Sequence, residues 1–358
     1  MRVCILGSGI SALTLAKALV NENIYVDIIS KNQNYKNSTS RTIGISMSNF
    51  NYFNKSIINI QKIAWEISKI EIYTDNLKNE KLLKFDNKGN QLFSILRNSK
   101  IYEILNKSLT HSKLCRRIKF KNKLLNFDEY NLVINTDYMN YLTKKFFSRK
   151  IAKSYNSIAY TTIIHHEKIL NNVATQIFTK KGPLAFLPIS KNKTSIVYSI
   201  QNLKKYSADE FNNLIFNYSS KYKINKIEKL ESFELKSFVL RSYYHENILA
   251  FGDLLHRIHP LAGQGFNMTI RDIKILINII KEKKNLGLSI DKSVIHQFEK
   301  KIKHKNYIFM NGIDLIYEFF NFERKLSNSI LSKSVKLFGK NPSINKIFTN
   351  IADKGLII

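Results

Sequence analysis

Apolar residues recur along the chain either at helical spacing or in the short runs and alternations of strands. The order of these patterns along the chain predicts the succession of helices and strands. Residues 2–6 form a short apolar run that predicts a buried strand, residues 11–20 have a helical pattern, and residues 25–29 predict a second strand. From about 154 to 240, apolar and polar positions mostly alternate with period two, which is typical of antiparallel strands. Residues 268–280 return to helical spacing. The chain is therefore expected to begin with a βαβ unit, continue into a sheet and end in helices.

This order predicts an α/β protein in which a Rossmann-like domain is interrupted by an inserted, mainly antiparallel β-sheet domain and followed by a C-terminal helical tail. The predicted strands 131–137 and 247–251 each return the chain to the first sheet. The first domain is accordingly assigned to 1–70, 93–150 and 241–290, the inserted domain to 71–92 and 151–240, and the C-terminal helices to 291–358. Ligands of such folds bind at the carboxyl ends of the strands and in the cleft between domains.

The first strand ends in Gly7-x-Gly9-x-x-Ala12, which leads into the first helix. In the dinucleotide-binding fingerprint, Gly7 would permit the tight turn, Gly9 the close approach of a pyrophosphate and Ala12 the close packing of helix on strand. A βαβ unit that binds no nucleotide can carry the same glycines. The second strand ends in Ser30 rather than in the carboxylate that normally holds a ribose, and Asp27 lies inside that strand. A hydroxyl binds ribose more weakly than a carboxylate, so we expect a weaker site.

A second ligand-binding sequence lies in the C-terminal half, immediately before the predicted helix 268–280. In chain order it contains Gly252, Asp253, His256, His259, Pro260, Gly263, Gln264, Gly265, Asn267 and Asp272. The backbone N–H groups at the start of a helix attract an anionic or electron-rich ligand edge. The two histidines and Asp253 would not complete a zinc site, because three or four coordinated ligands are needed and no further cluster is apparent. We therefore expect a ligand loop without a metal.

Together, the two sequences resemble the flavin-dependent aromatic hydroxylases of the para-hydroxybenzoate hydroxylase type, most closely the ubiquinone-biosynthesis branch that acts on polyprenylated phenols. Gly182–Ile189 resembles the substrate-side strand of that branch, Arg41 sits where the family has a flavin-contacting arginine, and residues 311–356 resemble its helical tail. The resemblance implies that the first domain binds FAD. The cofactor residues it implies are Gly7, Gly9, Ala12, Ser30, Arg41, Asp137, Gly252, Asp253, Gly263, Gln264, Gly265 and Asn267.

The same resemblance implies an FAD-dependent monooxygenase that hydroxylates a polyprenylated phenolic ring in ubiquinone biosynthesis, with NAD(P)H and O₂ as co-substrates. No catalytic side chain is expected, because the cofactor carries the chemistry and the protein supplies position and electrostatics. His259 and Pro260 are expected to line the flavin. Phe186, Leu187 and Pro188 are candidates for the apolar substrate wall, and ordinary strand core is the alternative for these three residues.

Several positions depart from the family pattern. Tyr138 replaces a glycine after Asp137 and would need strain to adopt glycine's backbone angles, while Lys144 replaces an arginine. Leu254 and Leu255 stand where the family has small residues, and overpacking of this kind costs about 1–3 kcal/mol. The chain resembles a divergent, shortened member. The alternative to an active enzyme is therefore a degenerate member that acts as a non-catalytic scaffold in a membrane-associated biosynthetic complex.

Composition limits the partners. The formal net charge is +30 over 358 residues, but the lysines are scattered and no nucleic-acid-binding motif appears, so no nucleic acid is expected. The basic, apolar segment 325–348 could contact anionic lipid or cap the core. Cys4 and Cys115 form no disulfide framework and suit a reducing compartment. We expect a cytoplasmic protein with peripheral contact at the inner membrane, since no apolar stretch has transmembrane length.

Overall fold

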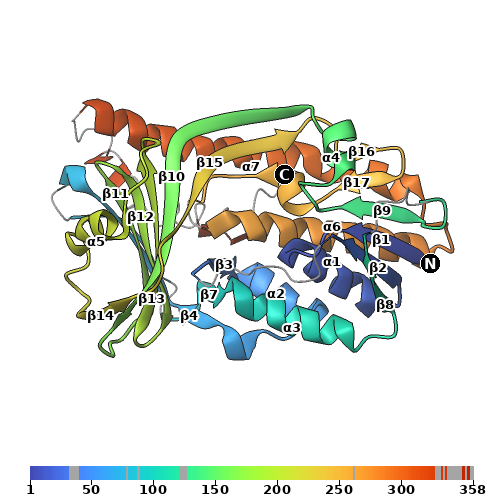
Figure 1. Ribbon diagram of the computed structural model, residues 1–358, viewed down its shortest axis with the longest axis horizontal. Helices are drawn as coiled ribbons and strands as arrows, with labels where there is room; N and C mark the ends of the chain where they lie inside the picture. Colours follow the sequence, from blue (N-terminus) through green and yellow to red (C-terminus); the bar gives the residue numbers. More distant parts are fainter. Residues whose placement is uncertain are drawn as a thin grey trace.

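The computed structural model describes residues 1–31, 40–77, 80–86, 89–120, 127–260, 263–326, 332–333, 335–336, 349–350 and 353–354. Its described residues form three sheets and seven α-helices, and the two larger sheets lie at opposite ends of the long axis (Figure 1). Two helices of the C-terminal half, α6 (Gln264–Asn285) and α7 (Lys292–Leu326), run lengthwise between these ends. Among the described helices, none has the length and apolarity to cross a bilayer.

The first sheet has the order β16-β17-β9-β1-β2-β8 and is parallel except for its β16–β17 edge. Its strands are β1 (Arg2–Leu6), β2 (Tyr25–Ser30), β8 (Cys115–Lys119), β9 (Leu132–Asn135), β16 (Tyr244–His245) and β17 (Ile248–Ala250). Helices α1 (Ile10–Asn21) and α3 (Asn98–Thr110) pack against each other beside it. β1 and β9 are buried throughout or nearly so, as expected of parallel strands covered on both faces. The short α4 (Tyr141–Phe146) follows β9.

The second sheet is mainly antiparallel and has the order β18-β15-β10-β13-β12-β11-β5-β6, with β14 paired to β10. Its strands are β5 (Lys69–Thr74), β6 (Lys81–Asp86), β10 (Lys150–His166), β11 (Val173–Thr179), β12 (Gly182–Ser190), β13 (Lys193–Gln201), β14 (Ile224–Ile227), β15 (Glu231–Leu240) and β18 (His256–Arg257). One face packs on α5 (Ala208–Phe216), which starts with a capping box between Ser207 and Glu210. The other face is directed toward the first sheet, α6 and α7.

A third, small sheet lies between the two larger ones. It consists of β3 (Thr42–Ser46), β4 (Trp65–Ile67) and β7 (Phe93–Arg97), and α2 (Met47–Ser56) follows β3. Short 3-10 turns η1 (Gln61–Ile63), η2 (Asp75–Leu77) and η3 (Gly252–Leu254) complete the described elements. α6 contacts β3, α1 and α2, so the helix after the second glycine sequence packs against elements that all lie within residues 1–56.

The predicted fold class is confirmed, with two differences in the elements. α6 begins at Gln264, four residues before the predicted start, because Gly263 adopts a left-handed conformation (φ 62°) and reverses the chain there. β10 is a single strand of 17 residues, which extends from the second sheet toward the first (Figure 1). Most of the tail segment 325–348 lies outside the described residues.

Candidate functional site

The N-terminus of α1 is open toward the carboxyl ends of the first sheet. Gly7 has a φ of +113°, and its N–H donates to the carbonyl of Ile29 at 2.9 Å, which joins the turn to the end of β2. No side chain caps α1, whose N-cap is Gly9. A Cβ placed on Gly9 would meet nothing within 4 Å, and Ala12 is fully buried against the sheet. The helix therefore presents unpaired N–H groups to an open space, which is the requirement for binding a pyrophosphate.

The two glycine sequences meet in space. A Cβ on Gly252, which has a φ of +65°, would lie 2.8 Å from Cβ of Ser11, so η3 lies directly against the first turn of α1. A Cβ on Gly7 would lie 2.4 Å from Oγ1 of Thr136 and 3.3 Å from the backbone nitrogen of Asp137. Segments 7–12, 136–137 and 252 therefore come together at one end of the sheet, and they do so only because side chains are absent at the two glycines.

The start of α6 provides a second uncapped helix terminus. Its N-cap, Gly263, makes no side-chain cap, and a Cβ on Gly265 would meet nothing within 4 Å. The side-chain oxygen of Gln264 is buried and has no hydrogen-bond partner. Asp253 in η3 is exposed. The first turn of α6 thus has open space at Gly265, and the buried side-chain oxygen of Gln264 is an acceptor that accepts no hydrogen bond.

The side chain of Asn267 holds the start of α6 in place. It is the fourth residue of α6, and its side chain is fully buried with all its hydrogen bonds made inside the protein. Its Oδ1 accepts from the backbone N–H of Ser46 (3.0 Å) and from Nδ2 of Asn49 (2.9 Å), and its Nδ2 donates to the carbonyl of Gly44 (2.9 Å). Asn267 therefore fixes α6 to β3 and α2, and the free N–H groups belong to the residues before it.

Gly44 and its neighbours were missed by the sequence analysis. A Cβ on Gly44 would lie 2.1 Å from the ring of Phe93, and a Cβ on Gly263 would lie 3.6 Å from the backbone nitrogen of Gly44. The ring of Phe93 can therefore lie over β3 only with glycine at 44, and the backbone of β3 at this position is within contact distance of Gly263. A glycine inside a predicted strand was the available signal, since it often marks a close backbone approach.

The remaining predicted cofactor residues surround this region at different depths. Ser30 ends β2 and is half-buried. Asp137 accepts a hydrogen bond from the N–H of Met139 (2.9 Å), so one of its oxygens closes a turn. The guanidinium of Arg41 lies 4.6 Å from the ring centre of Phe233 on β15. Ser30 ends β2 and Asp137 follows β9, so both lie at carboxyl ends of strands in the first sheet.

The expected strain at Tyr138 is absent. It is not among the described residues with positive φ, and its side chain is 42% exposed. Leu254 and Leu255 are fully buried in the main hydrophobic core.

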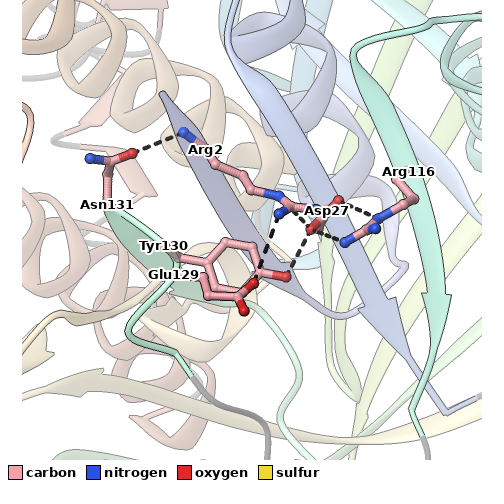
Figure 2. Close-up of polar contacts among 6 residues, drawn as sticks. All are labelled: Arg2, Asp27, Arg116, Glu129, Tyr130 and Asn131. Carbon is pink, nitrogen blue, oxygen red and sulfur yellow. Dashed lines mark hydrogen bonds and ion pairs between the residues drawn. The ribbon is translucent and has the colours of Figure 1, made fainter.

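Asp27 is excluded as a ribose ligand because other groups occupy its carboxylate (Figure 2). It accepts from Nε and Nη2 of Arg116 (3.0 and 2.9 Å) and from the hydroxyl of Tyr130 (2.8 Å), and it pairs with Arg2 (3.0 Å). Burial acts to raise the pKa of Asp27, but the hydrogen bonds from Arg116 and Tyr130 and the two positive charges outweigh it, so the pKa is lowered. A hollow of about 470 Å³ beside this cluster lies at the amino ends of the strands, away from the glycine sequences.

The two histidines of the second sequence are separated in the structure. Nε2 of His256 contacts Oδ2 of Asp272 at 2.6 Å in a fully buried pair, and Asn306 of α7 also reaches Asp272 (3.4 Å). His259 points elsewhere, against the rings of Tyr155 and Tyr317. In the part of the chain that the structure describes, no three His, Cys, Asp or Glu side chains are grouped so as to hold a metal ion.

The predicted substrate wall divides between two faces of β12. Phe186 is buried in the core under α5, where it stacks on Tyr222 at 5.6 Å, so it is a core side chain and not a wall. Pro188 is also buried. Leu187 lies on the opposite face, which packs toward the small third sheet. Of the three, Leu187 is therefore the one directed to the region between the sheets.

Comparison with known proteins agrees with this geometry. Residues 138–285 match the family described as FAD binding domain. The chain is 29% identical over 157 residues to 3-demethoxyubiquinol 3-hydroxylase of Escherichia coli, covering 41% of this chain and 39% of that protein. It is 24% identical over 233 residues to the mitochondrial ubiquinone biosynthesis monooxygenase COQ6 of Schizosaccharomyces pombe, covering 51% and 48%. The matches span between about two fifths and one half of these relatives.

Solved structures share the whole fold. The p-nitrophenol 4-monooxygenase PnpA of Pseudomonas putida superposes with a TM-score of 0.80 at 12% identity and covers 99% of this chain and 98% of that one. HpxO of Klebsiella pneumoniae, in complex with FAD and uric acid, superposes with a TM-score of 0.76 at 10% identity, covering 99% and 97%. At such identities the likeness establishes the fold. The sequence matches confirm the resemblance drawn from the two glycine sequences.

Proposed function

Because this chain is related in sequence to the ubiquinone-biosynthesis branch of the flavin-dependent aromatic hydroxylases and shares their fold, we propose that it is an FAD-dependent monooxygenase. The observation that carries the proposal is that α1 and α6 both start without a side-chain cap and both have open space at a glycine of the first turn or N-cap, while η3 contacts both helices. Two such termini suit a ligand with a pyrophosphate at one end and an electron-rich ring at the other.

The residues present fit FAD. The pyrophosphate would bind at Gly7 and Gly9 before α1, and Ser30 at the end of β2 would hold the ribose. Asp253, exposed beside the α6 loop, would accept hydrogen bonds from the hydroxyls of the ribityl chain, and the first turn of α6 would face the flavin ring. The buried side-chain oxygen of Gln264, which has no hydrogen-bond partner in the protein, would accept a hydrogen bond from the cofactor.

When bound, FAD would supply the redox chemistry, taking electrons from NAD(P)H and activating O₂ for transfer to an aromatic ring. The protein's own contribution is placement and electrostatics. The α6 terminus would stabilise negative charge on the reduced ring, and the buried His256–Asp272 pair would hold the loop in front of α6. Packing between the sheets would exclude water from the reacting ring.

The substrate would be a phenolic ring with a polyprenyl tail in ubiquinone biosynthesis, bound between the second sheet and the flavin. This step rests on the sequence relatives, which are named for ubiquinone hydroxylation and monooxygenation. Leu187 on the inner face of β12 would contribute to the apolar wall. A tailed substrate would be met at a lipid surface, so we also propose a cytoplasmic protein with peripheral contact to an anionic inner membrane.

The experiment is a titration of the purified chain with FAD, followed by flavin absorbance and fluorescence. Gly9→Val should weaken FAD binding by at least tenfold, because the added side chain occupies the space over the α1 terminus. Gly312→Ala on α7, where a Cβ also meets nothing within 4 Å, is the matched control and should bind as the unaltered protein does. Equal affinity of the two variants would contradict the proposed site.

A second function is favoured by Ser30, which replaces the ribose-binding carboxylate. The chain would then be a non-catalytic member that binds FAD weakly and acts as a scaffold in a membrane-associated biosynthetic complex. The two functions differ in NAD(P)H oxidation by the FAD-loaded protein. A phenol should accelerate that oxidation in an active enzyme and leave it unchanged in a scaffold.

A further inference from the structure

The imidazole of His259 is the most isolated buried polar group next to the α6 loop. It is 1% exposed, and neither Nδ1 nor Nε2 has a hydrogen-bond partner. Buried polar atoms in folded proteins are almost always paired, since leaving them unpaired forfeits their hydration. The imidazole of His259, four residues before the N-cap of α6, therefore has hydrogen-bonding capacity that the protein does not use.

Two tyrosine rings fix the orientation of this imidazole. Tyr155 of β10 meets it edge to face with ring centres 4.8 Å apart, and Tyr317 of α7 lies 4.5 Å away. The two tyrosine rings also pack edge to face on each other at 4.9 Å. His259 is thus held by elements from the second sheet and from the C-terminal helix at once, so its position depends on the docking of three parts of the fold.

Both tyrosine hydroxyls are committed to other partners. The hydroxyl of Tyr155 donates to the carboxylate of Asp314 in a buried pair, and that of Tyr317 is within 3.3 Å of Ser157 Oγ and 3.4 Å of Gln201 Nε2. Neither hydroxyl therefore satisfies His259. The rings are a frame for the imidazole, and its nitrogen atoms remain the unused polar atoms of the cluster.

A hollow lies next to this frame. It has a volume of about 660 Å³ and is lined by both tyrosines together with Asn156, Gln201 and Asn321. Tyr155 and Tyr317 therefore border both the hollow and the imidazole of His259.

We propose that His259 binds the hydroxyl of a neutral phenol, accepting its hydrogen bond at one ring nitrogen, and so positions the aromatic substrate of the proposed monooxygenase. The assignment rests on the proposed function and adds the residue that recognises the ring.

The charges of His259 and of the groups around it favour a neutral ligand over an anionic one. Burial, with a smaller contribution from Lys153, lowers the pKa of His259 to about 3, so the imidazole is neutral and has one acceptor nitrogen. Burial raises the pKa of Asp314, although its hydrogen bond with Tyr155 and the charge of Lys153 oppose the rise. A carboxylate ligand would be brought beside this acidic group without a buried cation to pair with it. A neutral phenol hydroxyl can donate a hydrogen bond to this acceptor nitrogen, whereas a benzoate carboxylate has no proton to donate.

The test uses the full chain labelled with [¹⁵N]histidine, with and without FAD, titrated with phenol and in parallel with benzoate. Phenol should move the acceptor-nitrogen resonance of His259 upfield, and benzoate should leave it in place. His259→Gln should lose this resonance and bind phenol about tenfold more weakly, the equivalent of one neutral hydrogen bond. Exposed His111→Gln is the matched control and should keep both the His259 signal and the affinity.

The outcomes separate this proposal from the proposed function. Failure to bind FAD, with the phenol shift intact, would remove the monooxygenase and leave the phenol site. FAD binding without any shift of His259 at saturating phenol would overturn the phenol site alone, as would a benzoate response equal to that of phenol. Because the resonance is measured on the unaltered protein, the result stands even if His259→Gln does not fold.

Discussion

His259 links stability to pH through its burial. Its pKa falls from an ordinary 6.5 to about 3, so between these values the unfolded chain binds a proton that the folded chain excludes. The free energy of unfolding should therefore fall as pH drops from 6.5 toward 3, by up to about 1.4 kcal/mol per pH unit from this group.

The measurement is urea unfolding at pH 7 and pH 5 for the unaltered protein and for His259→Gln, which does not titrate. The unaltered protein should lose more stability over this interval than the variant. Identical losses would mean that the imidazole is hydrated in the folded chain.

Gly252 should tolerate no side chain. Its φ of +65° disfavours L-residues, and a Cβ would approach Ser11 to 2.8 Å. We expect Gly252→Ala to lower the free energy of unfolding by about 1–3 kcal/mol from backbone strain and crowding. Gly9→Ala, where φ is −73° and the space is open, should change stability by less than about 1 kcal/mol. A chemical denaturation series on both variants tests the contrast, and similar losses would show that the two glycines do not differ as described.

Among the elements, the edge strand β8 depends on a single carboxylate of β2. Arg116 of β8 binds Asp27 through two nitrogens, while Arg2 of β1 and Tyr130 approach the same group (Figure 2). Asp27→Asn should lower the free energy of unfolding by about 2–3 kcal/mol at pH 7, because hydrogen bonds to the charged group are lost.

The pH dependence of the stability difference tests whether the charge of Asp27 is the cause. The folded pKa of Asp27 lies below its ordinary value of 3.8, so its contribution is present above that value and is lost as pH falls through the lower, folded pKa. The difference in stability between Asp27→Asn and the unaltered protein should shrink below about pH 4. A difference that persists there would point to packing rather than charge.

α6 and α7 depend on the buried His256–Asp272 pair, with Asn306 completing the link. The sequence places His256 and Asp272 in one motif but gives no indication that α7 would contribute to it. The sequence likewise gives no indication that the side chain of Asn267 joins α6 to β3. Polar residues in a ligand motif thus divide between those that face the ligand and those that hold the loop in place.

For the whole molecule, the net charge of +30 makes binding to anionic surfaces the default. Vesicles containing phosphatidylglycerol should retain the protein in sedimentation, whereas phosphatidylcholine vesicles should not. Retention should weaken as salt is raised from about 0.05 to about 0.5 M, since exposed charges are screened. Binding to mixed-sequence DNA of the same strength would favour a general polyanion interaction over a membrane one.

The βαβ start, the alternating sheet and the glycine turns followed from the sequence because each depends on local spacing. The pattern of residues 2–29 is sufficient for a strand, a helix and a second strand, and Gly7 and Gly252 do adopt the backbone angles that only glycine reaches easily. The family resemblance also depends on short motifs, so it could be recognised from the sequence without knowledge of the fold.

Other features required the folded chain because they join residues far apart in sequence. β12 is buried on both faces, so its composition could not tell Phe186, which packs under α5, from Leu187, which faces the region between the sheets. The contact of Gly44 with Phe93, the three partners of Asp27 and the isolation of His259 between two tyrosines arise from packing across the chain. The spacing of apolar residues determines which helices and strands form. Which side chains are buried, and which hydrogen-bond partners they find, depends on contacts that exist only after those helices and strands have packed together.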